Sequence, residues 1–224
     1  MKIILFQCIG LLVDGRKIRQ SFRENMAQLM SECYGKSVDA WKAADQQIVA
    51  DWAYYHADLN FSGEDGIEDI NEALFRVTRA LFTIANVPEP PKAEITNLAK
   101  ELISIPCKNM LLPDVLPAIE KCQEQGYTIG IFSYLLENQI RAITAEIPDL
   151  EPIIGADTLN HYEHDLMYFR KLAVRVKASP DKIRIVANSP QTLAIASQSG
   201  MQAIPVRQSS ASLESELVNV LKFN

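Results

Sequence analysis

The chain has 224 residues, of which 48% are hydrophobic, which is enough for one well-packed core or for a core with a small accessory domain. Its net charge of -6 and its pI of about 5.2 exclude the basic surface by which proteins bind nucleic acid, and no apolar run approaches the roughly 20 residues of a membrane-spanning helix. The four cysteines are widely spaced and form no CxxC pair, which predicts reduced thiols in a cytoplasmic protein. The apolar run that follows Lys2 lacks a small-residue cleavage site, so we interpret it as a strand rather than as a signal peptide.

The first ninety residues are predicted to contain one short strand followed by helices. Residues 3–6 are rich in β-forming side chains and end before Gly10. Apolar residues then recur every three or four positions over 16–34 and again over 67–84, which predicts two amphipathic helices. The sequence PEPP at 88–91 ends the second helix and indicates a hinge or linker.

The rest of the chain alternates between helical and strand patterns. We predict helices over 92–104, from 113 to Gly126, and over 136–146, 165–177 and 190–199, and strands over 127–132, 152–154, 183–186 and 203–206. This alternation predicts an α/β fold with a parallel sheet between two layers of helices. Ligands of such sheets bind at the carboxyl ends of the strands. Gln7, Ser133 and Asn188 each follow a strand, so they are expected to converge on one site.

The helical segment does not fit this alternation, and we interpret it as an inserted domain. Residues 1–15 and 91–224 then form the α/β core, and residues 16–90 form a helical cap over the carboxyl edge of the sheet. Between residues 39 and 72 there are nine acidic residues and a single lysine, Lys42. Such a run is typical of a solvated surface. If it lined the cleft instead, it would repel a phosphorylated substrate.

Three segments of the chain resemble the haloacid dehalogenase-like (HAD) superfamily, in the subclass with a helical cap inserted after the first strand. They are FQCIGLLVD (6–14), LPDVLPAIEKCQEQGYTIGIFS (112–133) and IVANSPQTLAIASQSGMQAIPV (185–206), and the resemblance covers nearly the whole chain. The resemblance implies a Rossmann-like parallel sheet flanked by helices, with an all-helical cap. The family comprises phosphatases and dehalogenases, whose first motif has the form FDxDGTLxD.

The chemistry of the family is not retained at the matching positions. The nucleophilic aspartate corresponds to Gln7, whose neutral amide cannot form an acyl phosphate. The general acid two residues later corresponds to Ile9, which has no proton to donate. Metal-free dehalogenation also requires the first aspartate, so the same argument applies to it.

The remaining family positions give the same result. The later aspartates that face Mg²⁺ correspond to Asn188 and Thr192, so the resemblance implies that no carboxylate is left for the metal and that no cofactor binds. The phosphate-neutralising lysine corresponds to Glu163, which reverses the charge. Of the family's phosphate-binding groups, only Ser133 is retained.

These substitutions predict a protein that keeps the fold without the catalysis, namely a non-catalytic binding or regulatory protein. It would bind a small polar ligand, neutral or cationic, in the cleft, or a protein partner through the cleft or the cap. The alternative is a HAD-family hydrolase with relocated or weak activity. A third interpretation is a structural or assembly partner whose cleft is filled by Ile9 and Leu11.

A few other residues carry groups that could restore chemistry. Cys8 lies in an apolar run and is interpreted as a core thiol, and Asp14 as a structural turn residue. His161 and His164 could bind a metal, but two histidines on one loop are a weak motif without further ligands. The stretch that contains Trp41, Trp52, Tyr54, Tyr55 and His56 is expected to form the core of the cap, or else a surface that binds a partner.

Overall fold

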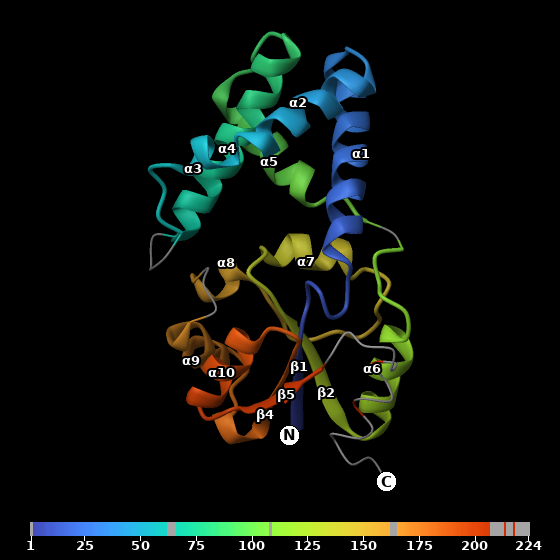
Figure 1. The fold of residues 1–224 in the computed structure, drawn as a ribbon, viewed down its shortest axis with the longest axis vertical. Coiled ribbons are helices and arrows are strands. Elements are labelled where there is room, and N and C mark those ends of the chain that lie inside the picture. Colours follow the sequence, from blue (N-terminus) through green and yellow to red (C-terminus); the bar gives the residue numbers. More distant parts are fainter. Residues whose placement is uncertain are drawn as a thin grey trace.

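The computed structural model describes residues 2–61, 66–107, 109–161 and 165–206, together with Leu213 and Leu217. Within these residues the strands form a five-stranded parallel sheet in the order β3-β2-β1-β4-β5 (Figure 1). The strands are β1 (Lys2–Gln7), β2 (Tyr127–Phe132), β3 (Ile153–Ile154), β4 (Ile183–Ala187) and β5 (Gln202–Pro205). The predicted parallel α/β sheet is therefore confirmed.

Strand β1 lies at the centre of the sheet because its apolar side chains can be buried on both faces. It pairs with β2 from Lys2–Tyr127 to Gln7–Phe132 and with β4 from Ile3–Ile183 to Phe6–Val186. Successive side chains of a strand point to opposite faces. Ile4 and Phe6 accordingly join one buried cluster, and Ile3 and Leu5 join the other. This register brings the carboxyl ends of β1, β2 and β4 to one edge.

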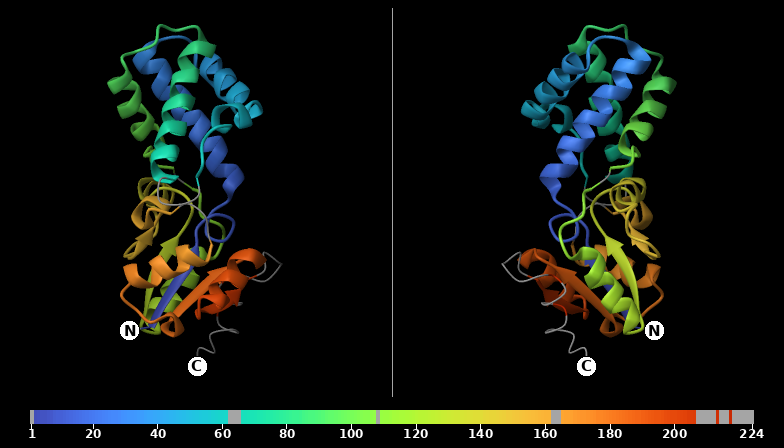
Figure 2. Two further views of the ribbon diagram at one scale, coloured as in Figure 1. Left: turned by 90° about the vertical axis from the view of Figure 1, so that its left-hand side faces the viewer. Right: turned by 90° about the vertical axis from the view of Figure 1, so that its right-hand side faces the viewer.

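Helices cover both faces of the sheet, as the two side views show (Figure 2). The cluster with Phe6 is closed by α6 (Val115–Glu124) and α7 (Glu137–Ile143). The cluster with Leu5 is closed by α8 (Ala156–Leu159), α9 (Leu166–Arg175) and α10 (Pro190–Gln198), with a short 3-10 helix, η1 (Pro180–Lys182), before β4. Helix α7 ends at Ile143, three residues before the predicted residue 146, and the N–H of its C-cap residue Thr144 donates to the Ile140 carbonyl.

The first part of the chain forms a separate layer of helices beyond the carboxyl ends of the strands (Figure 1). The layer comprises α1 (Gly15–Tyr34), α2 (Val38–Ala50), α3 (Trp52–His56), α4 (Gly66–Ala85) and α5 (Lys92–Ile103). These helices share a buried cluster around Trp41 and Phe82. Within the described residues, no helix is both long and apolar enough to cross a membrane.

The packing of α5 differs from the predicted boundary, which assigned residues from 91 onward to the α/β core. Leu98 and Leu102 of α5 belong to the cluster around Trp41, together with Met26 and Met30 of α1. The PEPP segment at 88–91 therefore joins two helices of one layer. The proline motif marks the end of a helix correctly, but it does not mark the point where the chain returns to the sheet.

Candidate functional site

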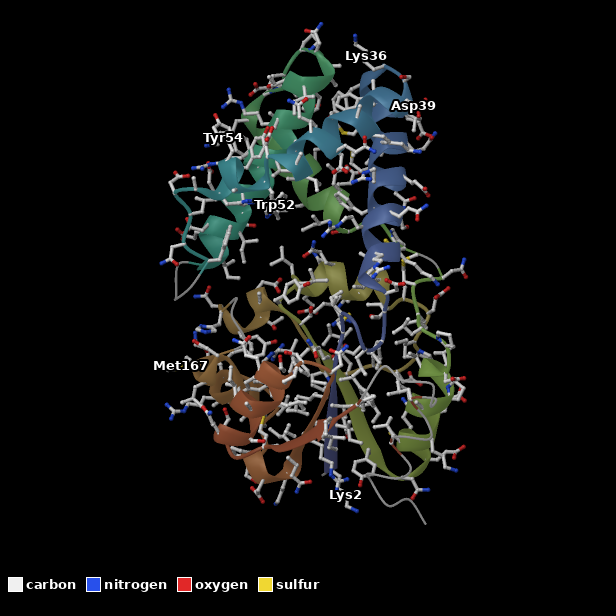
Figure 3. The ribbon with its side chains drawn as sticks, in the orientation of Figure 1. Lys2, Lys36, Asp39, Trp52, Tyr54 and Met167 are labelled. Atoms are coloured by element: carbon white, nitrogen blue, oxygen red, sulfur yellow. The ribbon has the colours of Figure 1, made fainter. Side chains whose placement is uncertain are left out.

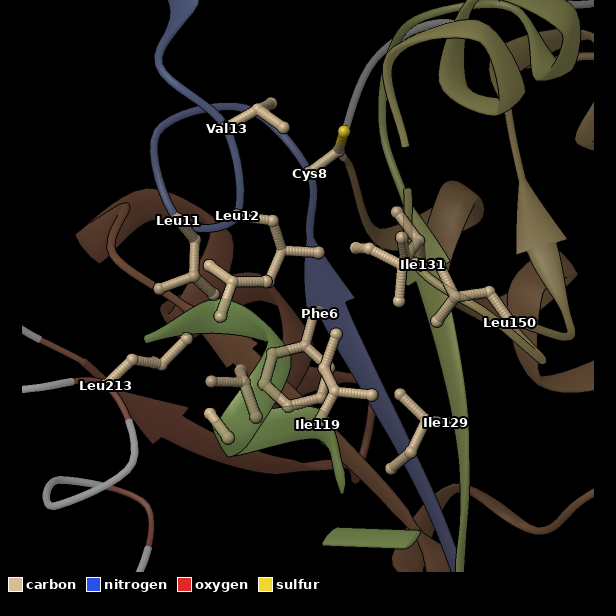
Figure 4. Packing of buried hydrophobic residues seen from close by; sticks show 14 of the residues in the cluster. Phe6, Cys8, Leu11, Leu12, Val13, Ile119, Ile129, Ile131, Leu150 and Leu213 are labelled. Carbon is tan, nitrogen blue, oxygen red and sulfur yellow. The ribbon is translucent and has the colours of Figure 1, made fainter. Parts of the chain in front are cut away.

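Backbone hydrogen bonds within the turn after β1 close it. The Gly10 N–H donates to the Val13 carbonyl at 2.9 Å, and the Leu12 N–H donates to the Cys8 carbonyl at 3.0 Å. Leu11 and Leu12 point into the cluster that contains Phe6 (Figure 4). Leu11 thus fills the core beneath the turn, while Ile9 is half-buried and packs against the same cluster.

Asp14 ends this turn and begins the next helix. Its carboxylate accepts a hydrogen bond from the Arg16 N–H at 2.8 Å and so caps α1. This contact agrees with the structural role expected for Asp14. The bond satisfies one of the backbone N–H groups in the first turn of α1 that have no acceptor within the helix.

The ends of β1 and β4 meet through the side chains of Gln7 and Asn188. The backbone N–H of Asn188 donates to Gln7 Oε1 at 3.3 Å, and the Asn188 side-chain Nδ2 donates to the Gly10 carbonyl at 2.7 Å. Gly10 has a φ of 81°, and a Cβ atom there would lie 3.1 Å from Asn188 Nδ2, so the position suits glycine. Two of the three strand-end residues expected to converge are therefore in direct contact.

Ser133, at the end of β2, directs its polar groups to the protein itself. The residue is 1% exposed, and its Oγ accepts from the Leu135 N–H at 3.2 Å. Its N–H donates to the Ile154 carbonyl at 3.0 Å, and its carbonyl accepts from the Tyr168 hydroxyl at 3.2 Å. Burial raises the pKa of Tyr168, so this hydroxyl keeps its proton and remains a donor.

Thr192 lies in the first turn of α10, where it is buried. Its N–H donates to Ser189 Oγ at 3.3 Å, which is the capping bond of that helix. The side chains at the four positions Gln7, Ile9, Asn188 and Thr192 are therefore two amides, an alkyl group and a hydroxyl. In the described part of the chain, no three His, Cys, Asp or Glu side chains gather in a way that could hold a metal ion.

Cys8 is enclosed in the core next to these positions. Burial raises the pKa of its thiol to about 12, so the thiol is protonated near neutral pH. A nucleophilic cysteine needs the opposite, namely a lowered pKa and exposure. The expected role of Cys8 as a core residue agrees with this environment.

The histidine loop is only partly described, because Glu163 and His164 lie outside the described residues. His161 is 6% exposed, and its Nε2 lies 2.8 Å from Asp165 Oδ1. The same oxygen accepts the Tyr168 N–H at 2.8 Å, so Asp165 both caps α9 and holds the imidazole. Neither Asp165 nor Tyr168 was predicted from the sequence to take part in the site. In the sequence, Asp165 stands directly before an apolar helical face, which is the position expected of a helix cap.

The aromatic stretch of the helical layer divides into a buried part and an exposed part. Trp41 is fully buried, as expected for a cap core, and its Nε1 donates to the Gly35 carbonyl at 2.8 Å. Trp52 and Tyr54 of α3 are 53% and 78% exposed (Figure 3). The Trp52 ring lies against His56, with 4.1 Å between the ring centroids. Only part of the stretch therefore serves the core.

A hollow of about 320 Å³ lies elsewhere, between α7 and β3. Its lining includes Arg141, Thr144, Ile147 and Glu151. Arg141 forms ion pairs with Glu137 at 2.7 Å and with Glu151 at 3.1 Å. None of the strand-end positions lines this hollow, so it is separate from the site at the edge of the sheet.

No protein-family model matches the chain, and no curated protein matches it in sequence. Solved structures match it along nearly its whole length. A 2-haloacid dehalogenase from Pseudomonas syringae pv. Tomato DC3000 is 20% identical, with a TM-score of 0.59 over 99% of this chain and 98% of the other. A HAD phosphatase from Thermococcus onnurineus is 16% identical, with a TM-score of 0.57 over 99% and 98% of the two chains. An L-2-haloacid dehalogenase from Xanthobacter autotrophicus, solved with chloropropionic acid covalently bound, is 15% identical, with a TM-score of 0.53 over 98% and 83%.

The chain has the HAD-like fold.

At these identities the likeness is one of fold, and function has to be argued from the side chains at the site. The HAD-like sheet places Gln7, Ser133 and Asn188 at one edge, below the layer of helices that resembles a cap. The amide and hydroxyl groups at this edge can donate and accept hydrogen bonds.

Proposed function

We propose that this HAD-like protein is non-catalytic and acts by binding a protein partner through its helical layer. The observation that carries the first half of the proposal is the contact of Asn188 with Gly10 and Gln7. Two neutral amides stand where hydrolysis needs charged carboxylates, and they hydrogen-bond to the protein itself.

Each step of hydrolysis lacks its group at this edge. The Gln7 amide is a poor nucleophile, and its oxygen already accepts the Asn188 N–H. Ile9 cannot protonate a leaving group. Mg²⁺ prefers carboxylate and other oxygen ligands, whereas Asn188 presents its NH₂ group to the Gly10 carbonyl. These side chains do not suit a magnesium ion, and we assign none to the protein.

A protein partner is favoured over a small ligand because the polar groups at the edge are already used. Ser133 is buried, with its N–H, its carbonyl and its Oγ all engaged within the protein. A ligand that replaced these bonds would have to break them first, at a cost of about 1 kcal/mol for each bond.

The surface around Trp52 and Tyr54 offers a partner both aromatic area and negative charge. Exposed tryptophan and tyrosine side chains are the residues that most often dominate binding energy at interfaces. Asp51 precedes Trp52 in the chain and is exposed. Of the other acidic residues between 39 and 72, Asp45 is paired with Arg23, and Asp58 and Glu72 are paired with Arg76. Exposed aromatic rings next to the Asp51 carboxylate fit a partner segment that carries arginine or lysine, since these cations also bind over aromatic faces.

The absence of catalysis is tested by measuring phosphate release from a panel of phosphomonoesters and halide release from 2-haloacids. Each assay is run with Mg²⁺ and with a chelator, and no release above the buffer blank is expected. If either assay shows release above the blank, it is repeated with the variants Asn188→Ala and His161→Ala. Turnover that disappears in Asn188→Ala would mean that the edge is catalytic. Turnover that disappears only in His161→Ala would support a hydrolase with relocated chemistry.

Partner binding is tested with two labelled peptides, one rich in arginine and one in which glutamate replaces each arginine. Fluorescence anisotropy is expected to show saturable binding of the first peptide alone. Replacing Trp52 by alanine should weaken binding by about 30-fold, the typical loss at an interface hot spot of about 2 kcal/mol. Val174→Ala is the control, because Val174 is an exposed apolar residue on α9, away from this surface. If the two variants bound the arginine-rich peptide with equal affinity, the surface around Trp52 would not be the binding site.

A further inference from the structure

The Asn188 amide joins two segments that are far apart in the chain. Its Nδ2 lies 2.7 Å from the carbonyl oxygen of Gly10, a separation of 178 residues. The backbone N–H of Asn188 donates to Gln7 Oε1 at 3.3 Å. These two hydrogen bonds connect the end of β4 to Gln7 and to the turn that follows β1.

Only a donor can make the shorter of these bonds. The Gly10 oxygen is an acceptor, and a carboxylate in place of the Asn188 amide would set a negative oxygen against it. A divalent cation or an N–H group could each satisfy such an oxygen, since both present positive charge to it. An amide does so without any ion, because it carries its own donor.

We infer that Asn188 is a positioning residue whose amide holds the turn after β1 against the end of β4 without a divalent cation. The inference rests on the proposed function in one respect, namely that the edge binds no metal. It adds a role for the amide itself, which is to fix the turn that carries Ile9 and Leu11. Gly10 contributes by its lack of a side chain, since a Cβ there would lie 3.1 Å from Nδ2.

The test compares the thermal midpoints of Asn188→Ala, Asn188→Asp and the wild-type chain, each with a chelator and with Mg²⁺ at matched ionic strength. Asn188→Ala removes the donor, and its midpoint is expected to fall by about 2–6 °C. The thermal midpoint of Asn188→Asp should fall further near pH 7, because its carboxylate faces the Gly10 oxygen. The wild-type midpoint should be the same with Mg²⁺ as with the chelator.

Acid pH provides a readout that a general packing defect would not give. The new carboxyl at position 188 is disfavoured in its charged form by the Gly10 oxygen, so its folded-state pKa lies above its unfolded value of about 4. The protonated form can donate, and its contribution is lost as the pH rises through the folded-state pKa. The deficit of Asn188→Asp relative to wild type should therefore shrink toward pH 4.

The control for added charge is Asn97→Asp on the exposed face of α5, where the new carboxylate meets only weak repulsion from Glu94 and Glu101, so its midpoint should fall by less than that of Asn188→Asp near pH 7. Wild-type midpoints in both Asn188 variants would overturn the inference. A wild-type midpoint that rises in Mg²⁺ would also overturn it, because the edge would then hold a cation. Phosphate release by the wild-type chain, with the Asn188 variants destabilised as expected, would instead overturn the proposed function alone.

Discussion

Replacing Trp41 by alanine is expected to lower the free energy of unfolding by about 3–5 kcal/mol, the usual cost of truncating a buried aromatic side chain. Trp41 is fully buried at the centre of the helical layer, and its ring meets Phe82 edge-on with 5.6 Å between centroids. The variant also leaves the Gly35 carbonyl without the indole N–H that it accepts at 2.8 Å. Urea unfolding followed by circular dichroism measures the loss without relying on tryptophan fluorescence.

Trp52→Ala is the matched control for this variant, because the chain contains two tryptophans and Trp52 is the exposed one. Removing an exposed side chain should change the free energy of unfolding by no more than about 0.5 kcal/mol. If Trp41→Ala were as mild as Trp52→Ala, then Trp41 would not be the centre of the helical layer.

Replacing Gly130 by alanine is expected to cost about 1–3 kcal/mol or more, because the added methyl group overpacks the sheet. A Cβ atom at Gly130 would lie 2.4 Å from the Pro152 carbonyl oxygen and 2.7 Å from Leu5 Cδ2. The Pro152 carbonyl cannot move freely, since it accepts the Ile131 N–H at 2.9 Å where the chain enters β3. The clash therefore has to displace the edge of the sheet.

Gly15→Ala controls for the loss of glycine flexibility. A Cβ at Gly15, the first residue of α1, would meet Ile9 Cγ2 at 3.4 Å, which is close to ordinary contact. Alanine at such a helical position is expected to leave stability unchanged or to raise it by about 0.4–1 kcal/mol. Thermal midpoints of the two variants, measured side by side, separate overpacking from backbone entropy. A Gly130→Ala variant as stable as wild type would contradict the packing between β2 and Pro152.

Local periodicity was sufficient to predict most of the elements of the fold. The apolar run before Gln7 and the run at 127–132 both became buried parallel strands, and the three-and-four spacing over 16–34 became α1. The glycines at 126 and 200 follow helices and have positive φ, which is common where a helix ends. These features are set by residues that are close together in the chain, so a single sequence is enough to predict them.

The sequence also established the identity of the groups at the edge of the sheet. Gln7, Ile9 and Asn188 are neutral in any conformation, so the limits on their chemistry follow once the strands are placed. Their mutual contacts did not follow. The bond from Asn188 to Gly10, the burial of Ser133 under Tyr168 and the joint role of Asp165 all depend on segments brought together by the sheet.

The sequence alone therefore determined the strands, the helical faces and the neutral character of Gln7, Ile9 and Asn188, because periodicity and side-chain chemistry are local properties. The tertiary structure alone decided that α5 joins the helical layer, that Trp41 is buried while Trp52 is exposed, and that Asn188 ties two loops together. An amphipathic pattern states that a face will be buried, but it does not state against which surface. The partner surface is decided only when distant segments pack. Packing also brings Asn188, at the end of β4, into hydrogen-bond contact with Gln7 at the end of β1 and with Gly10 in the turn that follows.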